Sequence, residues 1–513
     1  MYSAADFNLV KPIFNKIRKY SAPHVVAACI NKVRYAEEAP DRRYGQYQPW
    51  TLLLLIKWTL LYGDPQGSVQ RKTFGEDQLH NLLRDLQELS DRVDGKAAQL
   101  RDESGWFFFF RKLAFQQFPF QELTYTSRFA RQSLFFGNLQ PDDPLREQFR
   151  VRVGIDVQDF LEVTVIVLAR FFWQNQPSVT ESWFGSVSNS FPENCIRVFL
   201  RELSKDFLSV RAFLEEGRAV HAPEAKYELA EMSPLKRFPL LRIDPNYYCF
   251  SPRLLYRSLE HFIYDSLREQ GPQIFGDRFG KSIFEEYVGR AVRHTRLTSV
   301  TEAELQDVLG LQQKAVDYFI VDGNAHIYID AKAVEATYIG EVTEDPEHII
   351  QRVDSSVLKG VRQAYSLAQR LDGRTEVGPV TVGTPEERYL LIVTCKDLIL
   401  GCGRDFYHYI ARNELDEISR SYGNVAWIPF EHIYVISIED FDLFVQAVRD
   451  GSIGMAECLR RAVAADATPH WDQRKLIFRW HLYEMVGDLG PPTYLDVEFG
   501  EMMERIRNRF PDV

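Results

Sequence analysis

The chain has 513 residues and a formal net charge of −11 at neutral pH, with 45% hydrophobic and 26% charged residues. This length allows about two to four domains, and the composition is that of a soluble globular protein. The acidic total excludes a generally basic nucleic-acid coat, although a local basic surface would still bind phosphate. The six cysteines are scattered without a C-x-x-C pair, which favours free thiols in a reducing compartment over a disulfide framework or a zinc ribbon.

No stretch of the chain predicts a membrane span. Residues 1–20 carry charges but no apolar signal core, and the longest apolar runs are residues 50–62 and 163–173. Both runs are shorter than the ~20 residues that a spanning helix needs. We therefore expect a cytoplasmic protein with no membrane partner.

Residues 1–245 predict a helical domain, because several runs have apolar residues at helical spacing or are apolar throughout. These runs are residues 50–62, 77–93, 106–118, 157–173 and 195–215. The dense aromatics at residues 106–110 suit a packed helical core better than a ligand groove. We expect this half to act in sensing, targeting or oligomerisation, and its partner to be a second copy of the chain or a trigger protein.

One basic cluster near the N-terminus leaves two interpretations open. Lys11, Lys16, Arg18 and Lys19 lie among aromatic residues, as on a nucleic-acid surface that stacks bases. A solvated helix face explains the same pattern equally well.

The prolines between residues 222 and 245 predict a linker and a domain junction, because Pro223, Pro234, Pro239 and Pro245 interrupt any long helix. After it, residues 251–450 predict an α/β domain. Its expected elements are helices at residues 251–269, 279–288, 348–371, 405–422 and 439–448 and buried strands at residues 389–394 and 432–438. Residues 451–513 predict a helical C-terminal extension.

A hairpin at residues 314–333 lies at the centre of the α/β domain. Two runs rich in Val, Ile, Tyr and Phe flank Asp322-Gly323-Asn324, which is a strong hairpin signal. On the second strand Asp330 and Lys332 are two residues apart, so both point to one face.

The loop length decides where Asp317 points. A two-residue loop, at residues 322–323 or 323–324, puts Asp317 on the face of Asp330 and Lys332, whereas a plain three-residue loop sends it to the other face. Two adjacent carboxylates repel each other, and Mg²⁺, which prefers carboxylate oxygens, relieves that repulsion. An ordinary surface ion pair between Asp330 and Lys332 is the alternative.

Asp317 followed by Asp330-Ala331-Lys332 resembles the active-site hairpin of the PD-(D/E)XK nuclease superfamily, over roughly residues 275–445. Val316 stands where that motif has its proline. The resemblance implies a mixed sheet flanked by helices, in which Asp317, Asp330, the Ala331 carbonyl and an acidic residue of a preceding helix bind Mg²⁺ or Mn²⁺.

The resemblance also assigns residues on two helices. Glu285 is the expected acidic ligand, with Glu286 in reserve. Lys332 would position or activate the water, and Lys359 or Gln363 would orient the water or the phosphate.

The sequence therefore predicts a Mg²⁺-dependent nuclease, a hydrolase acting on DNA ahead of RNA, attached to a helical region like a bacterial antiphage or restriction-type effector. An RNA- or tRNA-cleaving nuclease stays open, as does an inactive nuclease-like binding or scaffold protein.

Overall fold

The structure is a computed structural model that describes residues 2–38, 45, 47–65, 72–98, 102–122, 125–185, 187–310 and 314–509. The chain forms two compact units that are not contiguous in sequence. The helical unit contains Met1–Asp102, Lys112–Pro272 and Glu498–Val513, and the α/β unit contains Glu103–Arg111 and Gln273–Val497. Within the described part of the chain, no helix has the length and apolar character needed to cross a membrane.

The helical unit contains a hydrophobic core built mainly from its first helices, with members from Val10 to Leu254. Its helices are α1 (Ala4–Ile17), α2 (Ala22–Glu38), α3 (Pro49–Tyr62), α4 (Glu76–Ala98), α6 (Ser127–Gln132), α7 (Pro144–Val153), α8 (Val157–Leu168), α9 (Cys195–Glu202), α10 (Phe207–Val220), α11 (Ala225–Glu228) and α12 (Pro252–Gln270), with α5 (Glu103–Gln121) divided between the units. Helix α3 is buried on all sides from Leu52 to Leu61 and is almost entirely apolar there. Its one charged residue, Lys57, is buried in ion pairs with Glu228 and Glu231. The predicted helical character of this half is confirmed.

The helical unit also contains a small sheet that the sequence did not predict. Its strands are β1 (Ser178–Thr180), β2 (Ser204–Lys205), β3 (Leu240–Ile243) and β4 (Asn246–Cys249), in the order β1-β4-β3-β2. The stretch predicted as a linker forms α11, a 3-10 turn and β3, and Leu235 and Leu241 are buried in the core. Pro234 starts that turn and Pro239 precedes β3, so these prolines mark the limits of short elements and not a linker.

The α/β unit is built on a five-stranded mixed sheet. Its strands are β5 (Ser299–Thr301), β6 (Tyr318–Asp322), β7 (Ala325–Lys332), β10 (Glu387–Thr394) and β11 (Ile433–Ser437), in the order β11-β10-β7-β6-β5, and β8 (Glu376–Val377) pairs separately with β9 (Val380–Thr381). Strand β6 is antiparallel to both of its neighbours, β5 and β7, whereas β7, β10 and β11 are mutually parallel. Every residue of β7 except Lys332 is buried.

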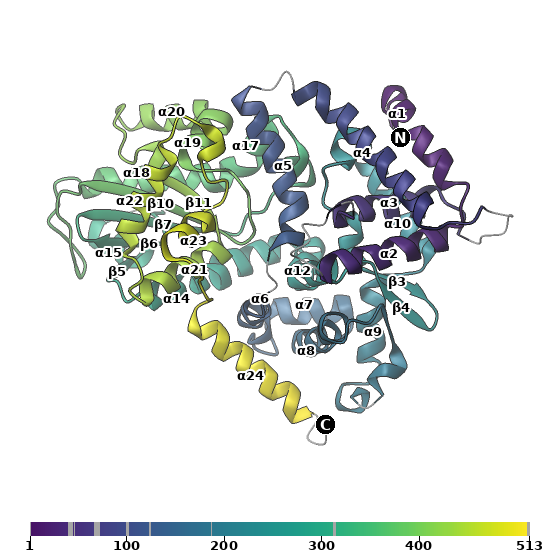
Figure 1. Ribbon diagram of the computed structural model, residues 1–513. Helices are drawn as coiled ribbons and strands as arrows, with labels where there is room; N and C mark the ends of the chain where they lie inside the picture. Colours follow the sequence, from purple (N-terminus) through teal and green to yellow (C-terminus); the bar gives the residue numbers. More distant parts are fainter. Residues whose placement is uncertain are drawn as a thin grey trace. The chain divides into compact units, whose positions relative to one another are not determined.

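Helices cover both faces of this sheet, as Figure 1 shows with α17, α18 and α20 on one side and α14, α21 and α23 on the other. The helices of the unit are α13 (Pro272–Phe275), α14 (Glu285–His294), α15 (Glu302–Leu309), α16 (Tyr338–Val342), α17 (Pro346–Val353), α18 (Lys359–Leu371), α19 (Gly403–Asp405), α20 (Arg412–Ser421), α21 (Ile438–Arg449), α22 (Met455–Asp466) and α23 (Arg479–Val486), with π-helical segments at Gly276–Phe284, Asp354–Leu358 and Phe406–Ile410. The predicted mixture of a helical part with an α/β part is therefore observed.

The C-terminal residues do not form a separate extension. Helices α22 and α23 lie in the α/β unit, where the backbone N–H of Ala456 donates to Asp322 Oδ2 at 2.8 Å, next to the hairpin turn. Helix α24 (Thr493–Arg509) passes from the α/β unit into the helical unit at Glu498. The observed units thus differ from the contiguous ranges 1–245, 251–450 and 451–513.

The first half of α5 belongs to the α/β unit, where Phe107 and Phe108 join the hydrophobic core and Arg111 is buried. Arg111 is 1% exposed, and its guanidinium donates to the carbonyls of Gly340, Leu398 and Ile399. Burial lowers the pKa of Arg111 to about 9, so it remains charged at neutral pH. A charge at this depth is stabilised by those three carbonyl groups.

Replacing Arg111 with Leu is expected to lower the free energy of unfolding by about 3 kcal/mol or more, because three buried carbonyls lose their donor. Denaturant unfolding followed by circular dichroism measures the change. The matched control is Arg84→Leu, an exposed helical arginine that contacts Asn81 only one turn away, which should change stability by less than about 0.5 kcal/mol. Equal effects of the two substitutions would contradict this account.

Candidate active site

The hairpin register places Asp317 directly opposite Asp330. Tyr318 pairs with Ile329 and Asp322 with Ala325, which leaves the two-residue loop Gly323-Asn324. Gly323 has φ of +59°, the sign that this type of two-residue loop requires at its first position. The register confirms the predicted parity, because the next pair outward is Asp317 and Asp330, and opposed residues of an antiparallel pair point to the same face.

Asp317 is anchored to the neighbouring strand. Its Oδ2 accepts a hydrogen bond of 2.6 Å from the backbone N–H of Ala331, the residue that follows Asp330. Asp317 is 8% exposed and Asp330 is 0% exposed. The two carboxyls therefore form a buried pair at the end of β7.

Lys332 supplies the nearest positive charge. Its Nζ lies 2.5 Å from Asp330 Oδ2 and donates to Gln363 Oε1 at 3.4 Å. Gln363 on α18 is itself fixed, because its Nε2 donates to the Ala315 carbonyl at 2.8 Å. Of the two candidates on this helix, Gln363 therefore contacts the site, whereas the Lys359 side chain is exposed.

Burial and mutual repulsion raise the pKa values of the carboxyls. The pKa of Asp317 rises to about 7, first through burial and then through the charge of Asp330, although Lys332 and the Ala331 N–H oppose the rise. Burial also raises the pKa of Asp330, against the opposing effect of Lys332. The pair titrates as a unit, and without a further cation it retains a proton near neutral pH.

Glu285 is the third acidic group near this pair. Its pKa is raised to about 7, first by burial and then by the charge of Asp317, while Lys314 and Lys332 act in the opposite direction. Glu286, the reserve, is exposed. The charge of Asp317 thus acts on Glu285, which is partly buried, whereas the Glu286 side chain is exposed.

The donor set fits a hard cation in part. Asp330 Oδ1 and Oδ2 are buried and accept no hydrogen bond within the described residues, although Oδ2 forms the ion pair with Lys332. In the described residues, no three His, Cys, Asp or Glu side chains are close enough to form a ready-made metal cage. Two carboxylates suffice for Mg²⁺, which keeps several waters and takes substrate phosphates as ligands. The ligand roles of Glu285 and the Ala331 carbonyl remain predictions.

His326, on the same face of β7, has a structural role. It is 2% exposed, packs edge-on against Phe319 at 5.2 Å between ring centroids, and has a pKa lowered to about 4 by burial. It is therefore neutral at physiological pH.

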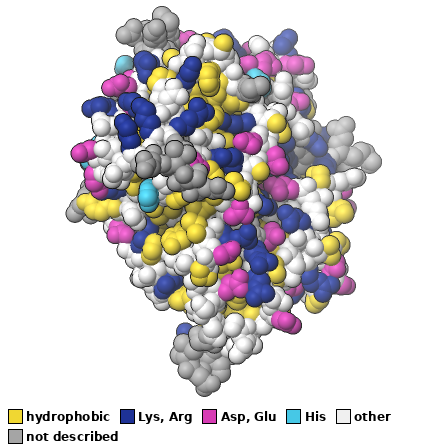
Figure 2. All heavy atoms as spheres, turned by 90° about the vertical axis from the view of Figure 1, so that its right-hand side faces the viewer, with side chains coloured by type: hydrophobic (Ala, Val, Ile, Leu, Met, Phe, Trp, Pro, Cys, Tyr) yellow, Lys and Arg dark blue, Asp and Glu magenta, His cyan; other side chains and the backbone are white. Residues whose placement is uncertain are grey.

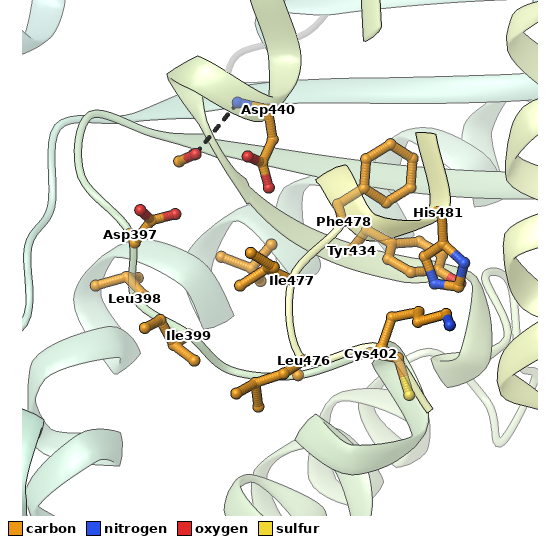
Figure 3. A pocket seen from close by; sticks show the side chains of 14 residues that line it. Asp397, Leu398, Ile399, Cys402, Tyr434, Asp440, Leu476, Ile477, Phe478 and His481 are labelled. Atoms are coloured by element: carbon orange, nitrogen blue, oxygen red, sulfur yellow. Dashed lines mark hydrogen bonds between the residues drawn. The ribbon is translucent and has the colours of Figure 1, made fainter. Parts of the chain in front are cut away.

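A second polar cluster, which the sequence did not reveal, lies beyond the ends of β10 and β11 (Figure 3). Arg479, 4% exposed, pairs with Asp440 at 2.5 Å and with Asp397 at 3.4 Å. Burial raises the pKa of Asp440 to about 7 despite Arg479. The cavity here measures about 10 Å³, room for one water molecule, and none of the predicted site residues lines it. This cluster fixes α21 and α23 at the strand ends; only the Ser437-x-x-Asp440 capping pattern hinted at it.

The basic N-terminal cluster fits the solvated-face interpretation. Lys16 pairs with Asp85 at 2.6 Å, and the Arg18 guanidinium lies over the Tyr62 ring. On the face drawn in Figure 2, Lys and Arg side chains are interspersed with Asp and Glu.

Comparisons of the chain with protein-family models, with curated proteins and with solved structures found no match. The chemistry of the candidate site therefore has to be judged from its own residues.

In EDTA, the free energy of unfolding should fall as pH rises from about 4 to 7. Asp317 and Glu285, whose folded pKa values are raised to about 7, hold more protons in the folded than in the unfolded state over this range. Melting temperatures at several pH values measure the effect. Asp317→Asn should melt higher than wild type at pH 8 and show a shallower pH dependence, and Mg²⁺ should raise the wild-type value most at pH 8. Identical pH profiles for the two proteins would contradict the raised pKa values.

Gly360 on α18 leaves space for the Asp330 carboxylate. A Cβ at this position would lie closer to Asp330 Oδ2 than real Cβ atoms approach other atoms. Gly360→Ala is expected to displace Asp330 and lower stability by about 1–3 kcal/mol through overpacking. Gly500→Ala, in the open middle of α24, is the control and should stabilise by about 0.5–1 kcal/mol. If both substitutions stabilise the protein, Asp330 is not held by this contact.

Proposed function

We propose that the α/β unit is a metal-dependent nuclease of the PD-(D/E)XK type, which hydrolyses phosphodiester bonds in nucleic acid, DNA ahead of RNA. The observation that carries the proposal is the pairing of Asp317 with Asp330 beside Lys332 on one face of the hairpin. Burying two neighbouring carboxylates costs free energy, so such a pair points to a role in binding a cation or in catalysis.

The order of elements around the site supports the same proposal. Helix α14 precedes three antiparallel strands, β5, β6 and β7, and α18 then leads to β10, which is parallel to β7. This is the succession of acidic helix, hairpin, helix and strand that the sequence resemblance implies. The carboxyls lie where β6 begins and β7 ends, so one end of the sheet holds all the groups of the site.

Each group has a defined task in phosphodiester hydrolysis. Asp317 and Asp330 would hold Mg²⁺ or Mn²⁺, with Glu285 and the Ala331 carbonyl completing the set. When bound, the ion supplies Lewis-acid activation of water and phosphate. In the reaction a water oxygen bonds to phosphorus, the bond to the leaving sugar oxygen breaks, and that oxygen takes up a proton.

Lys332 offsets negative charge that develops on the phosphate and orients the attacking water. Gln363 holds the Lys332 ammonium, so it is a positioning residue. Its second hydrogen bond, to the Ala315 carbonyl just before Asp317, links α18 to the start of β6.

An inactive nuclease-like binding or scaffold protein is the alternative. The complete burial of Asp330 and its ion pair with Lys332 favour it, because an inert ion pair has the same geometry. The two proposals differ in whether the protein cleaves nucleic acid when Mg²⁺ or Mn²⁺ is added.

Cleavage of plasmid, single-stranded DNA and RNA by the wild type with Mg²⁺ or Mn²⁺ is the direct test. Lys332→Ala and Asp330→Asn should each lower the cleavage rate by about 10²- to 10⁴-fold, because they remove charge stabilisation and a metal ligand. Lys359→Ala and Glu286→Gln are matched controls, since both side chains are exposed, and they should cleave within a few-fold of wild type. A wild type as inert as Lys332→Ala on every substrate and metal would leave the scaffold alternative.

A further inference from the structure

Helix α14, which begins with Glu285, ends in a row of arginines without acidic partners. Arg290, Arg293 and Arg296 are exposed, and no ion pair within the described residues includes any of them. The sequence has no Asp or Glu between Glu286 and Glu302. Arginines elsewhere in the same unit are commonly paired, as in Arg460–Glu387 and Arg474–Asp405.

The backbone at Arg296 is unfavourable for an arginine. Helix α14 ends at His294 with Thr295 as its C-cap, and Arg296 then has φ of +65°. This left-handed position after a helix normally holds Gly or Asn, because a Cβ is strained there. Arg296 thus has a strained backbone and makes no ion pair within the described residues, which suggests that its side chain has a functional role.

Contacts connect the arginine row to the candidate active site. The Tyr318 hydroxyl donates to the Glu285 carbonyl at 3.0 Å, and Tyr318 follows Asp317 in the chain. A Cβ at Gly289 would meet both the Tyr318 phenol and, at 3.2 Å, a guanidinium nitrogen of Arg293. Arg293 therefore lies beside the tyrosine that joins α14 to β6.

The row runs away from Glu285 along α14. With a rise of 1.5 Å per residue, Arg290 and Arg293 lie about 8 and 12 Å along the helix axis from Glu285. Arg296 follows at the turn into β5, the edge strand of the five-stranded sheet. Arg290 and Arg293 are thus about 4.5 Å apart along the helix axis, one turn from each other on neighbouring parts of the helix surface.

We propose that Arg290, Arg293 and Arg296 bind the phosphate backbone of the nucleic acid beyond the scissile bond, independently of its sequence. This inference rests on the proposed nuclease function. It identifies the surface with which a protein of net negative charge would bind a negatively charged nucleic acid. Arginine suits the task because its planar guanidinium binds phosphate oxygens through paired hydrogen bonds. Contacts of this kind position the substrate and carry no sequence information.

The test measures binding apart from cleavage. Fluorescence anisotropy with a labelled duplex of about 30 base pairs, in EDTA and between about 50 and 200 mM salt, gives the affinity and its salt dependence. The combined variant Arg290→Gln, Arg293→Gln, Arg296→Gly should bind at least tenfold more weakly and reduce the slope of log affinity against log salt by about 2 to 3. The control variant Arg370→Gln, Arg374→Gln, Arg461→Gln changes the net charge equally at exposed positions and should bind like wild type.

Arg296→Gly alone separates a binding role from a structural one. It relieves the left-handed strain, so it should melt at a higher temperature than wild type while binding duplex more weakly. A higher melting temperature with unchanged affinity overturns the binding role of Arg296. If the wild type cleaves nucleic acid but the combined variant keeps its affinity and salt slope, the arginine row is refuted and the nuclease stands. If the wild type neither binds nor cleaves, the nuclease proposal itself fails.

Discussion

The opposition of Asp317 and Asp330 across one hairpin is the constraint on which the candidate site depends. At about 4 Å, two like charges repel by about 4 kcal/mol in the effective dielectric of a protein surface, and burial increases the penalty. The nearby Lys332 provides one positive charge for two negative ones. One lysine does not neutralise two buried carboxylates, and the pKa of Asp317 is raised accordingly. The pair lowers its net negative charge by holding a proton. A divalent cation would remove that need, so proton and metal compete for the same oxygens.

Sequence reasoning succeeded where local rules decide the outcome. The period of two placed Asp330 and Lys332 on one face, and the Asp-Gly-Asn turn reduced the side of Asp317 to the question of loop length. The structure has the two-residue loop, which puts Asp317 on the same face. The sequence did not decide whether Lys359 or Gln363 contacts the site. That depends on which side of α18 faces the sheet, and tertiary packing determines this. The burial of Asp330 could not be predicted from the sequence either. It depends on Gly360, a residue of α18 whose missing side chain leaves room for the Asp330 carboxylate.

The domain ranges show a different limit of sequence reasoning. Prolines between residues 222 and 245 suggested a boundary, yet proline occurs equally at the first turn of a short helix or just before a strand. The α/β unit recruits Glu103–Arg111 from far upstream, and Arg111 caps the carbonyls of Gly340, Leu398 and Ile399. No local pattern marks such a contact. A fragment limited to residues 251–450 would leave those three buried carbonyls without their donor.

Helix α14 shows how an acidic chain can hold a polyanion near carboxylates. The continuous helical stretch from Pro272 to His294 carries Glu285 and Glu286 in its interior and Arg293 in its last turn, where the helix dipole favours positive charge. Opposite charges are thereby separated along one rigid element by about two turns. A phosphate chain attracted to the arginine end would pass toward the carboxyl end, where its own charge is repelled unless a cation is bound. In this arrangement, binding along α14 and cation loading at Asp317 and Asp330 support each other, because each reduces the repulsion that the other faces.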